Sequence, residues 1–371
     1  MPTQNSDING NPFAITYAGP GLTWKVANGV DVTGTAAAIV SVFANSKLIN
    51  KGSLFGGDYG VAWGPGGAFG TYTIDNMSSG EISGGIYGVY VSDFLGSLIV
   101  QNAGDIQGGT FGIYAVGSSD MRVDNTGEIS GGTFALFLAA SSAGGAGQVV
   151  NNHGMIESSQ YGFYASGPSN VRVMLNNDKG ALLKGGLAAI TDLSPLTVKN
   201  DGKIEGLVET YSYDDKIINK GKIKGDVWLG KGLDVFKNKG KAKAGLIDSN
   251  EGNDKIVLGD KKDKLLFDST LDSLTNVDTI KKFASGKDMM YLDDDIFTAL
   301  TPGALPSSQF HIGTSASDAD DFIIYDKASG ALYYDPDGNG IQSQIQFAQF
   351  KPGTKIVASD FTVGEYSIPL V

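Results

Sequence analysis

Two groups of aspartates in the C-terminal half of the chain have the types and spacing of calcium ligands. In the first group, Asp215, Asp234 and Asp254 follow one another at intervals of 19 and 20 residues. Glycines precede the last two, and glycine lets the carbonyl groups of a turn point together toward an ion that prefers oxygen ligands. The spacing predicts a column of one or two Ca²⁺ ions. Its expected ligands are Asp215, Gly230, Gly232, Asp234, Gly252, Asp254 and Asp263. A stack of aspartate-containing turns held by backbone hydrogen bonds is the alternative.

The second group lies in the stretch DPDGNG, where Asp335, Asp337 and Asn339 place oxygen ligands at alternate positions and glycine permits a sharp turn. These three residues are predicted as a further Ca²⁺ site. An EF-hand is not supported, because Ile345 and Gln346 stand where that motif has its bidentate glutamate. A β-hairpin turn explains the stretch equally well.

The elements that must position these turns belong to an internal repeat. Its unit is Asn-x-Gly, an aliphatic residue, Gly-Gly, and an aromatic-Gly-aliphatic-aromatic run. Three copies align without gaps: NAGDIQGGTFGIY at 102–114, NTGEISGGTFALF at 125–137 and NHGMIESSQYGFY at 152–164. The period of 19 to 27 residues predicts coils of two or three short strands. We therefore expect an all-β fold: a right-handed parallel β-helix or β-roll solenoid of about ten coils, followed by a smaller β-rich C-terminal module.

Positions that recur once per coil should stack into columns. Each asparagine is expected to hydrogen-bond the asparagine of the next coil, and the glycine after it to adopt the positive φ of a corner. The asparagine column comprises Asn50, Asn76, Asn102, Asn125, Asn152, Asn177, Asn200, Asn219 and Asn238, with Asn28 as a looser first member. One interior stripe comprises Leu54, Ile82, Ile106, Ile129, Ile156, Leu182, Ile204 and Ile223. A second comprises Val61, Val89, Ile113, Leu136, Phe163 and Ala189. An aromatic column, facing either the core or a ligand groove, comprises Tyr59, Tyr87, Phe111, Phe134 and Tyr161.

Coil length and composition divide the chain into four parts. Residues 1–25 form an N-terminal segment that either caps the first coil or adds to a neighbouring subunit as a strand. Residues 26–198 form a β-helix with 23–27-residue coils, residues 199–266 a narrower β-roll with 19–20-residue coils, and residues 267–371 the C-terminal module. Lysines in the narrower part are expected on a solvated strand face, with an anionic-polysaccharide patch as the alternative. They are Lys220, Lys222, Lys224, Lys237, Lys239, Lys241 and Lys243.

Composition excludes several classes of function. The 371 residues include no cysteine, so disulfides and thiolate metal sites are ruled out. The net charge is −12, and the acidic excess lies mainly at the C-terminal end, which disfavours nucleic acid and favours divalent cations. The N-terminus has no basic and apolar regions of a signal peptide, and no run approaches the roughly 18 apolar residues of a membrane span. Neither Sec export nor a transmembrane segment is predicted.

A family resemblance follows from these motifs. Leu229–Lys237 resembles the RTX nonapeptide G-G-x-G-x-D-x-U-x at every position except the first, and residues 249–257 and 258–266 match it in part. Residues 267–371 resemble the C-terminal module of RTX proteins exported by a type I secretion apparatus. The resembling blocks include Asn276–Ile280, Leu292–Phe297, Ala319–Asp326, Gly330–Asp335 and Ala358–Phe361. The resemblance implies an uncleaved C-terminal export signal and release outside, or onto the surface of, a Gram-negative bacterium. It also implies folding triggered by extracellular Ca²⁺.

The function expected from these observations is structural or adhesive. A surface-layer, matrix or filament subunit of this kind would self-associate into a homopolymer or lattice. No catalytic role is predicted, because the two histidines, His153 and His311, lie far apart in the sequence and no zinc-protease motif occurs.

The alternative is a solenoid that binds or cleaves a polysaccharide, of the lyase or epimerase type. Its groove would be floored by the aromatic column and walled by the loops at 64–71, 92–97 and 141–147. Arg122 and Arg172, each before a strand valine, would be a ligand pair in such a groove, although outward strand positions also explain them.

Overall fold

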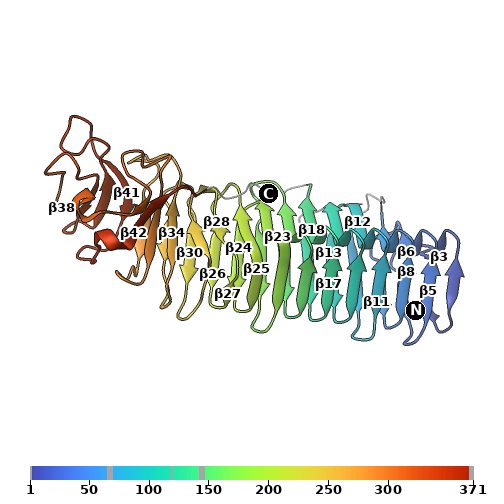
Figure 1. The fold of residues 1–371 in the computed structure, drawn as a ribbon. Helices are drawn as coiled ribbons and strands as arrows, with labels where there is room; N and C mark the ends of the chain where they lie inside the picture. Colours follow the sequence, from blue (N-terminus) through green and yellow to red (C-terminus); the bar gives the residue numbers. More distant parts are fainter. Residues whose placement is uncertain (1, 65–69, 118–119, 142–146, 367–371) are drawn as a thin grey trace. The chain divides into compact units, whose positions relative to one another are not determined.

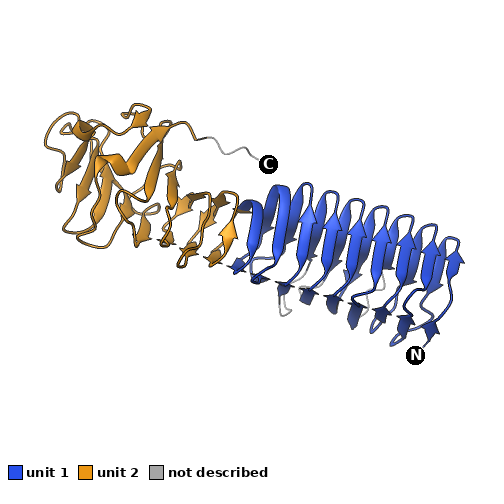
Figure 2. Cartoon of the chain, turned by 60° about the horizontal axis from the view of Figure 1, so that its bottom comes forward, with its two compact units in different colours: residues 1–208 blue, residues 209–371 orange. Residues whose placement is uncertain are grey.

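The predicted all-β solenoid class is confirmed. The computed structural model describes residues 2–64, 70–117, 120–141 and 147–366. About 55% of the chain is strand and 2% is helix, and parallel sheets form a β-solenoid of about 12 turns (Figure 1). The chain comprises two compact units: unit 1 is residues 1–208 and unit 2 is residues 209–371 (Figure 2).

Each coil of unit 1 contributes one strand to a first sheet and two strands to a second, except that in the last two coils one long strand, β23 (Leu182–Leu193) or β25 (Lys203–Thr210), replaces the two. In one such coil, β13 (Ser97–Asn102), β14 (Asp105–Gly108) and β15 (Phe111–Gly117) follow one another, and β16 (Asp120–Asn125) begins the next. Parallel pairing places Asn102 beside Asn125 and Ile106 beside Ile129. A shift of one residue in this pairing would move the buried side chains to the surface. Equivalent residues of successive sequence repeats therefore lie side by side in successive coils.

The other coils of unit 1 follow the same plan. The first sheet also contains β1 (Thr3–Gln4), β4 (Thr23–Val26), β7 (Lys47–Asn50), β10 (Thr71–Asn76), β19 (Gln148–Asn152), β22 (Val173–Asn177) and β24 (Leu196–Asn200). The second also contains β2 (Ile8–Gly10), β3 (Phe13–Thr16), β5 (Asp31–Gly34), β6 (Ala37–Ser41), β8 (Ser53–Gly56), β9 (Tyr59–Trp63), β11 (Glu81–Gly84), β12 (Tyr87–Phe94), β17 (Glu128–Gly131), β18 (Phe134–Ala140), β20 (Met155–Ser158), β21 (Tyr161–Ser166), β23 (Leu182–Leu193) and β25 (Lys203–Thr210).

The core of unit 1 is the predicted pair of stripes with two corrections. From Leu54 to Ile156 and from Val61 to Phe163, the stripe members are fully buried. In the next coil, however, Ile156 pairs with Leu183 and Phe163 pairs with Ile190. Leu182 and Ala189 are therefore each one position out of register with the stripes: Leu182 is partly exposed, whereas Ala189 is buried but takes the place of Gly162 in the preceding coil.

The asparagine column exists as a buried ladder. Its members in unit 1 are at most 2% exposed, and each donates from Nδ2 to Oδ1 of the next over 2.8–2.9 Å, from Asn50 to Asn200. Asn28 is not the first member, because it lies exposed in a turn and Val26 pairs with Asn50. Each buried amide thus satisfies its neighbour, which an isolated buried amide could not do.

The N-terminal segment forms a regular coil of its own chain. Its strands β1, β2 and β3 pair in parallel with β4, β5 and β6, in the same order as in every later coil. Ile15 and Tyr17 are buried and continue the core. This added coil is one reason why the solenoid has more turns than the ten expected.

The corner glycines are required for a different reason than the one predicted. Most of them, including Gly104, Gly127 and Gly154, do not have positive φ. Instead, the turns stack so closely that a Cβ atom on Gly127 would overlap the carbonyl oxygen of Gly104, and one on Gly154 would overlap that of Gly127. The glycine column therefore reflects the close approach of backbones rather than an unusual backbone conformation.

Gly127→Ala is expected to lower the free energy of unfolding by about 1–3 kcal/mol, because the added methyl group must displace the turn at Gly104 in the preceding coil. The measurement is urea denaturation of the full chain. Gly19→Ala is the matched control, since no atom lies within 4 Å of the Cβ position at Gly19. Equal stability of the two variants would contradict the role assigned to turn stacking.

Unit 2 continues with shorter strands. Its coil strands are β26 (Lys216–Asn219), β27 (Lys222–Ile223), β28 (Val227–Trp228), β29 (Lys231–Gly232), β30 (Val235–Asn238), β31 (Leu246–Asp248), β32 (Glu251–Gly252), β33 (Lys255–Val257), β34 (Lys264–Phe267), β35 (Asp278–Lys281) and β36 (Met289–Asp293). The rest are β37 (Gly303–Ala304), β38 (Phe310–Ile312), β39 (Ile323–Asp326), β40 (Ala331–Tyr334), β41 (Ile345–Gln349) and β42 (Phe361–Gly364), with the short 3-10 helices η1 (Ser307–Gln309) and η2 (Ala358–Asp360).

The C-terminal segment extends the solenoid of unit 2. Strand β41 pairs in parallel with β35, and β42 pairs in parallel with β36, so the two strands occupy the positions of a further coil. Around them, β40 pairs antiparallel with both β39 and β41, and β37 pairs antiparallel with β42. Phe297, Phe347 and Phe361 are buried in this part. The segment predicted as a C-terminal module therefore lies in the same compact unit as the short coils.

Candidate functional site

Four buried aspartates form a column in unit 2. Asp215, Asp234, Asp254 and Asp278 stand immediately before, or at the start of, strands that pair in register, namely β26, β30, β33 and β35. The Asp234 carboxylate accepts the backbone N–H of Asp215 over 2.7 Å, and the Asp254 carboxylate accepts that of Asp234 over 2.7 Å. Asp278 accepts the N–H of Asp254 over 3.0 Å. We call this set the carboxylate column.

The electrostatics of the carboxylate column are unfavourable for ionised groups. Asp234 and Asp254 are each 1% exposed, and Oδ2 of each finds no hydrogen-bond partner among the described residues. Burial, together with neighbouring carboxylates, raises the pKa of Asp234 and of Asp254 to about 8. Burial also raises the pKa of Asp278, although Ser249 Oγ donates to it over 2.6 Å. Either a proton or a cation would remove this penalty.

Glycine brings backbone oxygens beside these carboxylates. Gly232 has φ 156° and Gly252 has φ 147°, within the region that favours glycine. A Cβ atom on Gly232 would overlap the carbonyl oxygen of Tyr213 and lie 3.1 Å from Asp234 Oδ1. One on Gly252 would overlap the carbonyl oxygen of Gly232 and lie 3.1 Å from Asp254 Oδ1. Carbonyl and carboxylate oxygens, which hard cations prefer, thus converge at successive turns.

The predicted ligand set is brought together in part. Asp215, Asp234 and Asp254 share one column, and Gly232 and Gly252 lie against it. Gly230, with φ 74°, lies over the backbone of Tyr211 in the same run of turns. In the described part of the chain, no three acidic or histidine side chains form a group able to hold a metal ion. A cation here would therefore depend on main-chain carbonyls as well as on carboxylates.

Asp263 lies elsewhere, on the asparagine ladder. Its Oδ1 accepts from Asn238 Nδ2 over 2.7 Å and its Oδ2 accepts from the N–H of Gly259 over 2.8 Å. Both oxygens are thus occupied, at the opposite end of β30 from Asp234. The nonapeptide spacing did not reveal this, because the match at 258–266 follows directly on the match at 249–257 and places its aspartate at the other end of the strands.

Asp278 is a column member that sequence reasoning missed. It follows Asp254 by 24 residues rather than by 19 or 20, so the coil period did not point to it. The available signal was local: Val277-Asp278-Thr279-Ile280 repeats the order of residue types in Leu233-Asp234-Val235-Phe236.

The DPDGNG stretch is the connection between the antiparallel strands β40 and β41. Asp337 Oδ2 accepts the N–H groups of Ile341 and Gln342 over 3.0 and 3.2 Å, and Asp335 Oδ1 accepts that of Asp337 over 3.4 Å. Asn339 donates from Nδ2 to the carbonyl oxygen of Ser317 over 3.4 Å rather than toward the two carboxylates. The hairpin geometry accounts for the stretch, and within it the side chains of Asp335 and Asp337 interact with each other.

Unit 1 carries a different feature, a double row of aromatic rings on its outer surface. The predicted column from Tyr59 to Tyr161 is partly exposed, while the neighbouring interior residues are fully buried. Consecutive rings are nearly parallel, with centroids 4.9–5.2 Å apart. The predicted column therefore does not face the core, because its rings face outward.

A second aromatic column lies beside the first. Tyr90, Tyr114, Phe137 and Tyr164 are also partly exposed, and their rings follow one another at 4.7–5.4 Å. Rings of the two columns meet edge to face, as between Tyr87 and Tyr90 at 5.0 Å. The final aromatic residue of each repeat was the sequence signal for this column. The nine rings of both columns are called the aromatic strip below.

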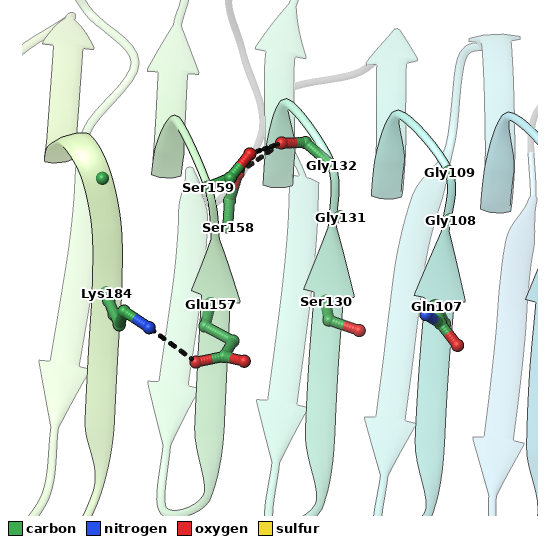
Figure 3. A pocket seen from close by; sticks show the side chains of 11 residues that line it. Gln107, Gly108, Gly109, Ser130, Gly131, Gly132, Glu157, Ser158, Ser159 and Lys184 are labelled. Carbon is green, nitrogen blue, oxygen red and sulfur yellow. Dashed lines mark hydrogen bonds and ion pairs between the residues drawn. The ribbon is translucent and has the colours of Figure 1, made fainter.

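A polar depression of about 440 Å³ lies at the Gly-Gly bends of the same coils (Figure 3). Gln107, Ser130, Glu157 and Lys184 stand in register along it, and Lys184 Nζ pairs with Glu157 over 3.4 Å. No other ionisable side chain is among its described lining residues. The depression thus lacks the pair of carboxylates that hydrolysis of a glycosidic bond requires.

The remaining candidates form local pairs. His153 Nδ1 lies 2.8 Å from Asp178, and His311 Nδ1 lies 3.4 Å from Asp321 in the other unit. Arg122 pairs with Asp124 on its own strand over 2.7 Å. Among the lysines of the narrower part, Lys237 is partly exposed and the others are exposed, as expected for outward positions. Residues 65–69 and 142–146, from two of the proposed groove walls, lie outside the described residues.

No protein-family model matches the sequence, and no curated protein or solved structure matches it either. The resemblance to RTX proteins therefore depends on the quoted motifs alone. In the described residues, no helix has the length and apolar character needed to cross a lipid bilayer.

Proposed function

We propose that this protein is a secreted, calcium-stabilised β-solenoid with a structural or adhesive role outside the cell, and that it acts by binding rather than by catalysis. One observation carries the proposal: Asp234 and Asp254, on successive turns, each bury a carboxylate oxygen that has no hydrogen-bond partner among the described residues. Evolution tolerates such a penalty where a ligand or a proton relieves it.

The donor set around the carboxylate column fits calcium. Asp215, Asp234 and Asp254 would hold the ion together with carbonyl oxygens of the turns at Gly232 and Gly252. A bound Ca²⁺ would supply the positive charge that lets these carboxyl groups remain ionised at neutral pH. The turns would then be cross-linked to one another through their own oxygens, so that part of the binding free energy becomes stability of unit 2.

Export through a type I secretion apparatus belongs to the same proposal. It is supported by the order of the C-terminal sequence blocks and by the acidic character of the chain. Extracellular calcium concentrations would favour the ion-bound form, whereas the low calcium of the cytoplasm would favour the unfolded form that export requires. Self-association into a homopolymer or lattice is proposed as the way in which the solenoid acts.

Titration calorimetry of the chelator-treated full chain with Ca²⁺ is the test. We expect saturable binding by the wild type, and at least tenfold weaker binding by the Asp234→Asn/Asp254→Asn double variant. Asp260→Asn is the matched control, because Asp260 is an exposed carboxylate in the same unit. Light scattering in the same samples reports self-association.

Wild-type binding that the double variant retains would place the ion elsewhere, and an absence of calcium binding by the wild type would overturn the proposal. Loss of binding by Asp260→Asn would show that the effect is one of net charge.

A further inference from the structure

We infer that the aromatic strip of unit 1 is the binding surface for an uncharged, extended polysaccharide of β-linked sugars, with one sugar ring per coil. The inference deepens the proposed adhesive function by naming the class of partner, and rests on that function only for the biological purpose of binding. It uses residues of unit 1 that have no part in the carboxylate column.

The geometry of the rings leaves surface available for a ligand. Parallel rings in the first column are 4.9–5.2 Å apart between centroids, which exceeds the contact distance of about 3.5–4.0 Å between carbon atoms. Neighbouring rings are therefore offset rather than fully covered by one another, the arrangement that aromatic pairs prefer. Part of each ring remains open toward solvent, in agreement with the partial exposure of Tyr87, Phe111 and Phe134.

Aromatic rings bind sugars through the C–H groups on the face of a pyranose. These carry a small positive partial charge and pack against the negative face of the ring. The faces of β-linked sugars with equatorial hydroxyls present such C–H groups along an extended chain. A row of rings is therefore a suitable surface for a sugar chain aligned with the solenoid axis.

The spacing of the strip matches an extended chain. Coils of a solenoid repeat at about 4.7–4.9 Å, the spacing of adjacent strands. One sugar ring of an extended β-linked chain is close to this length, so successive sugars would lie over successive aromatic rings. A polypeptide strand, with its shorter rise per residue and alternating side chains, would not keep this match.

The charges around the strip favour an uncharged ligand. The row before the first column consists of one acid, Asp58, followed by the uncharged residues Ile86, Thr110, Thr133 and Gln160. The outward row after the second column consists of Ser92, Val116, Ala139 and Ser166. Burial is the main cause that raises the pKa of Tyr114 and of Tyr164, and the nearby acids Asp93 and Asp192, respectively, raise them further. An anionic polysaccharide would be repelled by these groups.

Tyrosine hydroxyls supply polar contacts along the same line. Tyr59, Tyr90 and Tyr114 lie close enough to Tyr87 to raise its pKa, although burial has the larger effect. Phenol groups at this spacing can donate to, and accept from, the hydroxyls of consecutive sugars. The strip thus combines apolar faces with a row of neutral hydrogen-bonding groups.

The experiment is calorimetric titration of the full chain, in calcium, with cello-oligosaccharides from cellobiose to cellohexaose. We expect affinity to rise with each added sugar until the chain spans the five rings of the first column. Oligogalacturonides of the same lengths are expected to bind at least tenfold more weakly. Binding without length dependence, equal or tighter binding of oligogalacturonides, or no binding of either series would overturn the inference.

Two pairs of substitutions test the rings themselves. Phe111→Ala/Phe134→Ala is expected to weaken cellohexaose binding roughly tenfold, or about 1.4 kcal/mol, because it removes two of the five rings of the first column. Phe111→Tyr/Phe134→Tyr keeps both rings and is expected to bind within threefold of the wild type, so the test remains valid if the alanine variant does not fold. Leu274→Ala, which removes an 84% exposed apolar side chain from unit 2, is the matched control.

The result can be separated from the calcium proposal. Asp234→Asn/Asp254→Asn should bind cellohexaose like the wild type, because its substitutions lie in unit 2. Sedimentation of the wild type and of Phe111→Ala/Phe134→Ala tests the competing occupant, a second copy of this chain. A wild-type dimer that the alanine pair abolishes and that cellohexaose does not dissociate would assign the strip to self-association instead.

Discussion

In the presence of a chelator, raising the pH from about 4 to about 8 is expected to lower the free energy of unfolding of unit 2 by several kcal/mol. The pKa values of Asp234 and Asp254 are about 8 in the folded protein, against 3.8 for an unperturbed aspartate. Between these limits the folded state binds more protons than the unfolded state, so stability falls as the pH rises. The stabilisation is fully present below the unfolded pKa and is lost as the pH passes the folded pKa.

The measurement is urea-dependent hydrogen exchange by mass spectrometry on the full chain, corrected for the intrinsic pH dependence of exchange. Peptides covering β30 and β33 report on the carboxylate column, and peptides covering β13 and β16 report on unit 1 as an internal reference. Millimolar calcium is expected to restore stability at the higher pH, since a cation replaces the protons.

Replacing Asp234 and Asp254 by asparagine separates the pH dependence of stability from a general loss of stability. The Asp234→Asn/Asp254→Asn variant keeps an oxygen acceptor for the backbone N–H groups but carries no charge, so its stability in chelator should change little with pH. Asp260→Asn should retain the wild-type profile. Stability of the wild type that increases from pH 4 to pH 8 in chelator would show that the column is neutralised by another group.

Asn125→Leu is expected to destabilise unit 1 by about 3 kcal/mol or more. Asn125 Nδ2 donates to Asn152 Oδ1 over 2.9 Å, to the Met155 carbonyl over 3.0 Å and to the Gly127 carbonyl over 3.1 Å, and its Oδ1 accepts from Asn102 over 2.9 Å. Leucine has a similar volume but can make none of these bonds. Each buried group left unsatisfied costs about 1–3 kcal/mol, and the ladder couples neighbouring coils.

Urea denaturation with hydrogen exchange of peptides from β13 to β22 would measure the loss. Asn28→Leu, the same exchange at an exposed position, should leave stability nearly unchanged. A loss confined to the coil of Asn125, with Asn102 and Asn152 unaffected, would mean that the ladder consists of independent turns rather than a coupled array.

The repeat was readable from the sequence because a solenoid places the same demand on the same position of every coil. The side chains of Asn102, Asn125 and Asn152 each donate a hydrogen bond to one neighbouring amide and accept one from another. Because asparagine recurs at this position for that reason, residue type alone identifies the ladder. The interior stripes were readable for the same reason up to Ile156. The next coil has two consecutive leucines, and only the pairing of Ile156 with Leu183 decides which one is buried.

The candidate sites were predicted less completely. The column of Asp215, Asp234 and Asp254 followed from a near-constant period, but Asp278 follows a longer coil. Asp263 has the same local motif as the column members and lies at the other end of the strands, because a coil turns back on itself between successive motifs.

The sequence by itself determined the all-β solenoid class, the asparagine ladder, most of the core and the presence of a stacked aromatic column, because these depend on residue type repeated at a fixed interval. Only the tertiary structure decided which way the aromatic rings face, which turns bring carboxylates together, and why the corner glycines are needed. Those properties depend on the direction of a side chain and on the distance between backbones of different coils. Neither quantity is encoded in the order of residues within one coil.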